Sequence, residues 1–374
     1  GVGPARVSLG RRPASTAPTI HPTADDPVVG ALSEVVGGPV GTRVRERAGR
    51  RGVDSWWSPL RVLLALTAVT FALGLVAKTA CVDDQFRGEA QLARVCSSDV
   101  ADSYTGTGLV EAAWPWSGDE ATRSRHPVLE EPALVGLWSY AAARATLVLA
   151  GSPDLVERGA TPVEDLPRDP DVRRERVIFV GVNALGFAAL ALLSTAALSR
   201  VHRRRPWDAA GFALAPLLVV TGLSAWDLLA VSAVALALLA WSRRRRGLAG
   251  ALVGVGAAAG VWPALLLVAL VLSARSRRVL DVVPALLAAV AAWVVVNAAA
   301  FLSGREQWAR SWEAAVDRGP DSGTVWFVLD ATVGLDDSTV QSLSWVLLGV
   351  WVAAVAALSL LAPVPPRAGQ AGLL

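Results

Sequence analysis

The sequence predicts an all-α polytopic membrane protein. Of its 374 residues 53% are hydrophobic and only 18% are charged, and the mean hydropathy is +0.45. Soluble domains carry about 25% charged residues. The apolar residues also gather in runs of about 20, the length that a helix needs to cross a bilayer. The same composition excludes a disordered chain, a collagen-like rod and a disulfide-rich scaffold.

Three segments are expected along the chain. Residues 1–58 are polar, with scattered proline and glycine, and are expected to form a disordered cytoplasmic tail. Residues 59–362 contain all the apolar runs and are expected to form one multi-helix transmembrane domain. The short proline-rich segment 363–374 is expected to be a second cytoplasmic tail.

The first spanning helix is expected at residues 59–78. It is apolar apart from Arg61, and the arginines between positions 43 and 51 precede it. By the positive-inside rule its start lies in the cytoplasm, so Lys78 emerges outside. Further spanning helices are expected where apolar runs recur: 177–199, 209–225, 226–242, 248–274, 282–302 and 341–362.

Two of the apolar runs are expected to be irregular. Within 248–274 the pair Trp262-Pro263 predicts a break, because proline interrupts a helix. Residues 132–151 contain Arg144 and follow two glutamates, which makes them a poor spanning helix. We expect this run to be re-entrant or interfacial, since the next helix must run inward if the following arginine clusters are all cytoplasmic. The alternative is that residues 132–151 cross the membrane and that the arginine cluster at 203–205 is extracytoplasmic.

Polar residues gather on the face that is expected to be extracytoplasmic. The outer loop (residues 79–131) is long and rich in tryptophan and proline, so we expect it to be ordered against the membrane surface. The corner at 224–227, the break at 260–263 and the loop at 303–340 emerge on the same side. The sequence therefore predicts the functional site there.

Cysteine usage leaves two alternatives open for the outer loop. Cys81 and Cys96 are the only cysteines. They either form a disulfide, which for a loop of about 15 residues contributes about 3 kcal/mol, or remain free thiols. There is no Cys/His cluster with metal-ligand spacing, no P-loop and no HExxH motif. Arginine clusters beside apolar runs are typical of membrane anchors, so no nucleic-acid partner is expected.

Two carboxylates are candidates for chemistry. Asp99, just past the first helix, could act as a general base toward an acceptor hydroxyl, and the alternative is a solvated loop aspartate. Asp227 begins an otherwise apolar helix. An acid at the membrane edge is a functional candidate, and the alternative is a helix-start acid favoured by the helix dipole.

Several cationic and aromatic residues accompany them. His126 is the only histidine expected on the outer face. Arg123 and Arg125 beside it could bind a phosphate in bidentate fashion or contact lipid headgroups. The segment 305–318, with two tryptophans, is predicted to be an amphipathic interfacial helix or part of an aromatic belt.

Several motifs occur in one order along the chain. They are Cys96-Ser97-Ser98-Asp99-Val100, His126-Pro127-Val128-Leu129, Arg204-Arg205-Pro206-Trp207-Asp208-Ala209-Ala210, Trp226-Asp227-Leu228-Leu229-Ala230-Val231 and Arg318-Gly319-Pro320-Asp321 followed by Trp326. This ordered set resembles C-Y-S-D-I, Y-P-V-L, R-R-P-W-D-A-A, N-W-D-L-L-A-V and R-G-A-D…W of actinobacterial membrane proteins in glycosyltransferase family 87.

The resemblance implies a GT-C-like helical bundle with a long first extracytoplasmic loop, in a multi-pass protein of the cell membrane. It implies transfer of a sugar, mannose or a related one, from a polyprenyl-phosphate donor to a lipid-linked or cell-envelope glycan acceptor. The essential acid of the first outer loop maps onto Asp99. We predict that Asp227 and His126 are supporting catalytic residues. The partners implied are the donor, the acceptor and membrane lipids. No cofactor is firmly implied, and a divalent metal is left open.

One departure from the family concerns the broken helix. The family reads A-A-K-L-Y-P where this chain has Ala258-Ala259-Gly260-Val261-Trp262-Pro263. A lysine would suit a donor phosphate, and Gly260 offers no cation. Arg123, Arg125 or Arg144 is therefore expected to bind that phosphate instead. The alternative function is a non-catalytic relative, acting as a transporter or as a scaffold of envelope assembly.

Overall fold

The structure is a computed structural model that describes residues 58–81, 98–126, 131–202, 205–273, 279–317, 326, 329, 332–334 and 336–361. The two predicted cytoplasmic tails lie outside these residues, apart from Ser58. Within the described residues all regular secondary structure is helical. This confirms the predicted all-α fold.

Three helices are long and apolar enough to cross a membrane. They are α2 (Pro59–Thr79), α8 (Pro170–Val201) and the Val282–Ser303 part of α14 (Val279–Ser303). Both α2 and α8 begin with proline after a capping side chain, Ser58 and Asp169 respectively. Proline suits this first position, because its fixed φ fits a helix and no intrahelical hydrogen bond is lost there. The fold class, a polytopic membrane protein, is confirmed.

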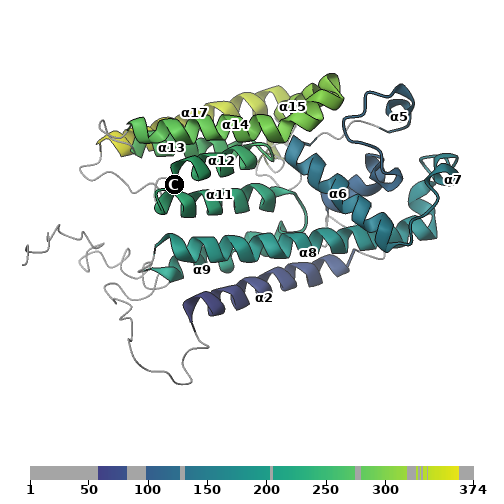
Figure 1. Cartoon of the computed structure of the whole chain (residues 1–374), viewed down its shortest axis with the longest axis horizontal. Coiled ribbons are helices and arrows are strands. Elements are labelled where there is room, and N and C mark those ends of the chain that lie inside the picture. Colours follow the sequence, from purple (N-terminus) through teal and green to yellow (C-terminus); the bar gives the residue numbers. More distant parts are fainter. Residues whose placement is uncertain are drawn as a thin grey trace, which may run out of the picture. The chain divides into compact units, whose positions relative to one another are not determined.

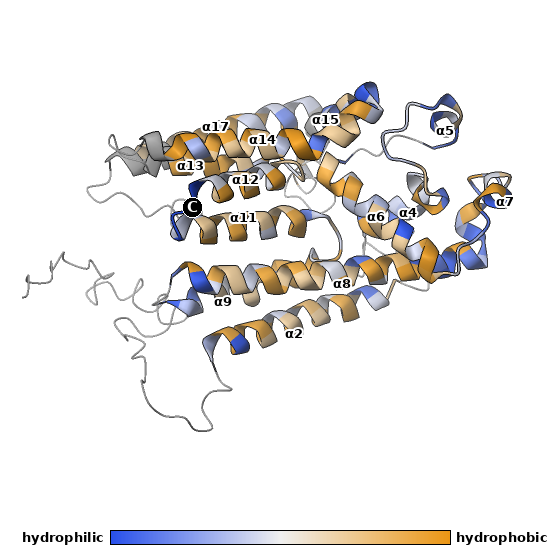
Figure 2. Ribbon diagram, in the orientation of Figure 1, coloured by the Kyte–Doolittle hydropathy of each residue, from blue (hydrophilic) through white to orange (hydrophobic). Residues whose placement is uncertain are grey.

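The apolar helices pack side by side. Contacts link α2 to α8, α8 to α11 (Asp227–Ser242), α11 to α12 (Arg246–Ala257), and α12 to α14 (Figure 1). Figure 2 shows that hydrophobic residues predominate along these helices, whereas hydrophilic residues concentrate near their ends and around α5 (Glu120–Arg125) and α7 (Leu155–Gly159). The remaining elements are α4 (Asp99–Gly106), η1 (Leu109–Glu111), α6 (Ala133–Leu149), η2 (Leu166–Arg168), η3 (Pro206–Ala209), α9 (Ala210–Ala213), α10 (Pro216–Val220), η4 (Trp262–Ala264), α13 (Leu265–Ser273), α15 (Arg305–Asp317) and α17 (Asp337–Leu361).

Small residues allow α12 and α14 to pack closely. A Cβ added at Gly250 of α12 would lie 1.9 Å from the carbonyl oxygen of Ala285 in α14, and one at Gly254 would lie 2.1 Å from that of Ala289. Only glycine permits this approach. The spacing is the G-x-x-x-G pattern that brings two apolar helices together in lipid, where there is no hydrophobic drive for helices to associate.

The structure corrects one predicted helix and confirms one predicted break. Residues 209–225 do not form a single spanning helix, because Pro216 divides them into α9 and α10. Ala215 is extended there, as expected of a residue before proline. The predicted break at Trp262-Pro263 is present, since α12 ends at Ala257 and η4 begins at Trp262.

The run expected to be re-entrant or interfacial forms α6. This helix has 17 residues and runs obliquely to the parallel helices in Figure 1. It contacts η1 of the outer loop and also α8, where the Trp138 indole N–H donates to Asn183 Oδ1 at 2.9 Å. The Arg144 side chain is exposed. Whether α6 crosses a bilayer stays a prediction.

Candidate active site

Asp99 lies where the outer loop contacts the corner before α11. Its backbone N–H donates to the carbonyl oxygen of Ser224 at 2.9 Å, and the Ser98 hydroxyl donates to that of Leu223, also at 2.9 Å. Ser98 also caps α4 by accepting from the Ala101 N–H. Two segments that are distant in the sequence are thereby joined by one backbone hydrogen bond and one from the Ser98 side chain, with Asp99 as the first residue of α4.

The side chains of the two predicted acids are both exposed at this corner. Asp99 starts α4, and Asp227 starts α11 only three residues after Ser224. An exposed carboxylate is accessible to a substrate. The structure therefore brings together the segments that carry Asp99 and Asp227, as expected from their predicted position on one face.

Lys78 occupies the same corner and was not among the predicted site residues. It lies in the last turn of α2, is only 4% exposed, and donates from Nζ to Ser224 Oγ at 2.6 Å. Its ammonium also interacts electrostatically with Asp99. The sequence offered one signal that could have found it: Lys78 is the only lysine among 35 basic residues.

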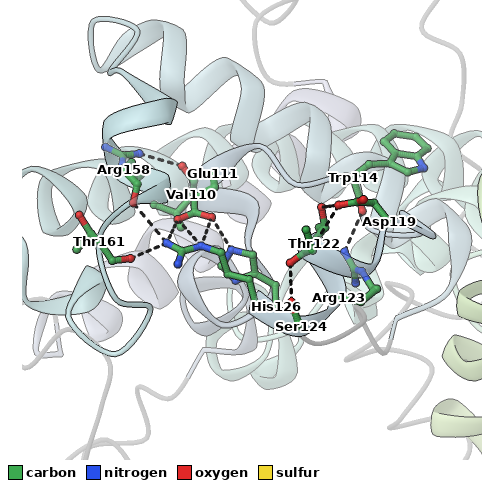
Figure 3. A network of polar contacts seen from close by, with 12 residues as sticks. Val110, Glu111, Trp114, Asp119, Thr122, Arg123, Ser124, His126, Arg158 and Thr161 are labelled. Carbon is green, nitrogen blue, oxygen red and sulfur yellow. Dashed lines mark hydrogen bonds and ion pairs between the residues drawn. The ribbon is translucent and has the colours of Figure 1, made fainter.

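A second group of polar residues is centred on Glu111 of η1. Its carboxylate accepts from Arg125 at 2.5 Å and 2.9 Å, and from His126 Nε2 at 2.7 Å (Figure 3). Burial alone would raise the pKa of Glu111, but the hydrogen bonds from Arg125 and His126 outweigh it and hold the pKa at about 2. Asp119 helps to place both donors by capping α5 through the Thr122 N–H. His126 is thus a buried partner of Glu111.

The third group fastens the outer loop to α8. Glu175 accepts two hydrogen bonds from Arg158, at 2.7 Å and 2.8 Å, and one from the Tyr104 hydroxyl at 2.8 Å. Burial and the Glu175 charge raise the pKa of Tyr104, so its hydroxyl remains a donor. Arg158 also donates to the Val110 carbonyl at 2.9 Å. Since Tyr104 and Asp99 share α4, these contacts fix the helix that presents Asp99.

The arginines proposed for the donor phosphate differ in their surroundings. Arg125 is bound to Glu111 and donates to the Thr161 carbonyl at 2.7 Å. Arg123 donates to the Trp114 carbonyl at 3.3 Å. Arg144 is exposed on α6. Two of the three thus contribute to holding the outer loop in place.

The outer loop also contacts the start of the loop at 303–340, and the start of α6 contacts the chain near the break at 260–263. The Trp114 indole N–H donates to Ser303 Oγ at 2.7 Å, and a Cβ at Gly304 would lie 2.1 Å from the Trp116 carbonyl oxygen. The Leu134 N–H, at the start of α6, donates to the carbonyl of Ala258 at 2.9 Å, just before the broken helix. The outer loop therefore contacts the corner at 224–227 and the start of the loop at 303–340, while α6 contacts Ala258 beside the break.

Two further expectations concern cysteine and metal. Cys81 is disulfide-bonded, which favours the first of the two alternatives; Cys96, the other cysteine, lies outside the described residues. In the part of the chain that the structure describes, no group of three or more His, Cys, Asp or Glu side chains could hold a metal ion.

Comparison with known proteins identifies one family. The model of glycosyltransferase family 87 matches residues 171–373. This range begins in α8 and includes the corner at Ser224, Asp227 and the broken helix, while Asp99 and the outer loop precede it. No curated protein and no solved structure matches the chain.

Proposed function

Since the chain belongs to glycosyltransferase family 87, we propose that it transfers a sugar from a polyprenyl-phosphate donor to a lipid-linked or cell-envelope glycan acceptor. The sugar is mannose or a related one, and the reaction takes place on the extracytoplasmic face of the cell membrane. The family match supports a membrane glycosyltransferase in general. The donor, the sugar, the acceptor and the residues below belong to the proposal.

The observation that carries the proposal is the hydrogen bond from the Asp99 N–H to the Ser224 carbonyl. It ties an exposed carboxylate on the outer loop to the matched region of the family, three residues before Asp227. Tyr104 and its bond to Glu175 hold the same short helix from its other end. A general base needs this combination of a fixed backbone and an accessible side chain.

In the proposed reaction Asp99 accepts the proton of an acceptor hydroxyl. The acceptor oxygen then attacks the anomeric carbon of the donor sugar from the face opposite the polyprenyl phosphate. The bond between the anomeric carbon and the phosphate oxygen breaks, and its electron pair leaves with the phosphate. The new glycosidic bond has inverted configuration. The negative charge that develops on the phosphate requires a nearby cation or dipole.

The supporting residues have distinct proposed roles. Asp227, exposed at the start of α11, orients the acceptor in this proposal. His126 supports the reaction indirectly by holding Glu111 and with it the outer loop. Among the arginines, Arg144 is the strongest candidate for the donor phosphate, because Arg125 would have to leave Glu111 to bind it.

The test is sugar transfer by the purified protein in liposomes. Labelled polyprenyl-phosphate mannose and other polyprenyl-phosphate sugars are supplied together with envelope lipid acceptors. The wild type is expected to form labelled product with at least one donor, and Asp99→Ala to lose about 100-fold or more of that rate. Absence of transfer by the wild type with every donor would overturn the proposal.

A second candidate function rests on Gly260. The resemblance places a lysine here, and this chain has none within the break between α12 and η4. A relative without transfer activity could move or organise lipid-linked sugars instead. In that case liposomes containing the wild type would carry a labelled polyprenyl-phosphate sugar across the bilayer and form no glycan product.

A further inference from the structure

We infer that Lys78 is a positioning residue for Asp99: its buried ammonium, fixed on Ser224, keeps the Asp99 carboxylate ionised and oriented at the corner. This inference rests on the proposed role of Asp99 as the base. It adds a residue of α2, which the family match does not cover, to the site.

The burial of Lys78 calls for an explanation. A lysine ammonium is strongly hydrated, and burying it is costly unless hydrogen bonds and an opposite charge replace the water. At the end of a spanning helix a lysine can extend into the interface instead. Lys78 is nevertheless only 4% exposed, and all the other basic residues of the chain are arginines.

Ser224 connects Lys78 to Asp99. Its hydroxyl accepts from Lys78 Nζ at 2.6 Å and donates to the Val220 carbonyl at 2.9 Å, so the oxygen that receives the ammonium is itself oriented. Its carbonyl accepts the Asp99 N–H at 2.9 Å. One residue therefore holds the side chain of Lys78 and the backbone of Asp99 at the same place.

The end of α2 is held firmly around Lys78. The Lys78 carbonyl accepts from the N–H of Cys81 at 3.1 Å. Cys81 is fully buried and disulfide-bonded, so the backbone after α2 is held as far as Cys81. The backbone that carries Lys78 is consequently held in place, while its ammonium is bound to Ser224.

The other charges around the corner include both signs. Asp102 on α4 and Asp227 on α11 carry the same sign as Asp99. On α8, Glu175 is also negative and is bound to Arg158, while Arg176 donates to Thr105 Oγ1 at 2.8 Å. Lys78 supplies the opposite charge that interacts with Asp99 and keeps it able to accept a proton.

The first test compares pH profiles of sugar transfer. Lys78→Met removes the charge at similar length, and Lys78→Arg keeps it. In Lys78→Met the pH below which transfer falls off is expected to rise by about one unit or more, with the rate recovering at higher pH. Lys78→Arg should stay near the wild type. Arg61→Met removes a charge from the exposed start of the same helix and is expected to leave the profile unchanged.

The second test does not depend on activity. Infrared difference spectra of the protein in liposomes follow carboxyl protonation on a pH change, and the Asp99 band is the one lost in Asp99→Asn. This band is expected to appear at higher pH in Lys78→Met than in the wild type. An unchanged position in a folded Lys78→Met protein would overturn the inference.

The two tests separate the inference from the proposed function. A shifted infrared band without transfer by the wild type would overturn the proposed function and support the pairing of Lys78 with Asp99. Transfer by the wild type with no shift of the band would support the proposed function and overturn the pairing of Lys78 with Asp99. If Lys78→Met fails to fold, Ser224→Ala removes the hydrogen bond to Nζ and is expected to shift the band in the same direction; no shift in that variant would overturn the inference.

Discussion

The backbone N–H of Asp99 donates a 2.9 Å hydrogen bond to the carbonyl of Ser224, and this bond joins the outer loop to the corner that precedes Asp227. Because it is a backbone contact, substitution of the Asp99 side chain leaves it in place. The chemistry of the carboxylate can therefore be tested without taking the corner apart.

The Glu111 network predicts a specific dependence of stability on pH. The folded pKa of about 2 lies below the ordinary value of 4.5. Such a group stabilises the fold above the unfolded value, and its contribution disappears as the pH falls from about 4.5 toward 2. Glu111→Gln is expected to lower the free energy of unfolding by about 3 kcal/mol at pH 7, measured by thermal unfolding in detergent.

The same experiment supplies its own controls. The difference between wild type and Glu111→Gln should shrink when unfolding is measured below about pH 3. Asp165→Asn, which breaks an exposed ion pair with Arg168, should change stability by less than about 1 kcal/mol. A difference in stability at Glu111 that stays constant with pH would show that its charge is not what holds the network.

The packing of α12 on α14 predicts a contrast between two glycines of one helix. Gly254→Ala places a Cβ 2.1 Å from the Ala289 carbonyl and should destabilise the protein by about 1–3 kcal/mol. Gly247→Ala enters open space and should be neutral or stabilising by up to about 1 kcal/mol. Thermal unfolding of both variants measures this, and equal melting temperatures would contradict the close contact.

The broken helix offers a test by addition of a charge. A Cβ at Gly260 would have the Trp262 ring as its nearest neighbour, at 3.6 Å, so a side chain can be added there without a clash at the Cβ. If a missing cation limits donor binding, Gly260→Lys is expected to lower KM for the donor about tenfold. Gly260→Met has similar length without charge and serves as the control. The same KM in both variants would show that the break does not meet the donor phosphate.

If α6 does not cross the membrane, as the sequence predicts, α7 lies on the extracytoplasmic side. Val156 on α7 is 85% exposed, so a cysteine there can react with a membrane-impermeant maleimide. Labelling of intact cells is expected at Val156→Cys, whereas Arg244→Cys, in the predicted cytoplasmic cluster, should react only after permeabilisation. Labelling of Val156→Cys only from the cytoplasm would mean that α6 crosses the membrane.

Patterns along the chain predicted the fold class well, because length and hydropathy determine which helices can span. The break at Trp262-Pro263 followed from proline chemistry. The same chemistry at Pro216 divides 209–225 into α9 and α10, whereas the apolar content of these residues alone predicts one helix. The local sequence is thus enough to predict a helix break where a single proline determines the backbone conformation.

The site was predictable only in part. Asp99 and Asp227 could be placed on one face from topology, since helix ends alternate between the two sides. The pairing of Glu111 with His126 and the position of Lys78 depend on contacts between segments that are distant in the sequence. Nothing in the local pattern around Lys78 indicates that it is buried beside Ser224.

The most direct test of the central claim is the rate of sugar transfer in liposomes by Asp99→Asn and Asp102→Asn. Both aspartates are exposed on the same short helix, so the two variants lose the same charge from neighbouring positions. Asp99→Asn is expected to lose about 100-fold or more of the wild-type rate with an unchanged melting temperature, while Asp102→Asn is expected to stay within about threefold. Equal rates in the two variants would contradict Asp99 as the base.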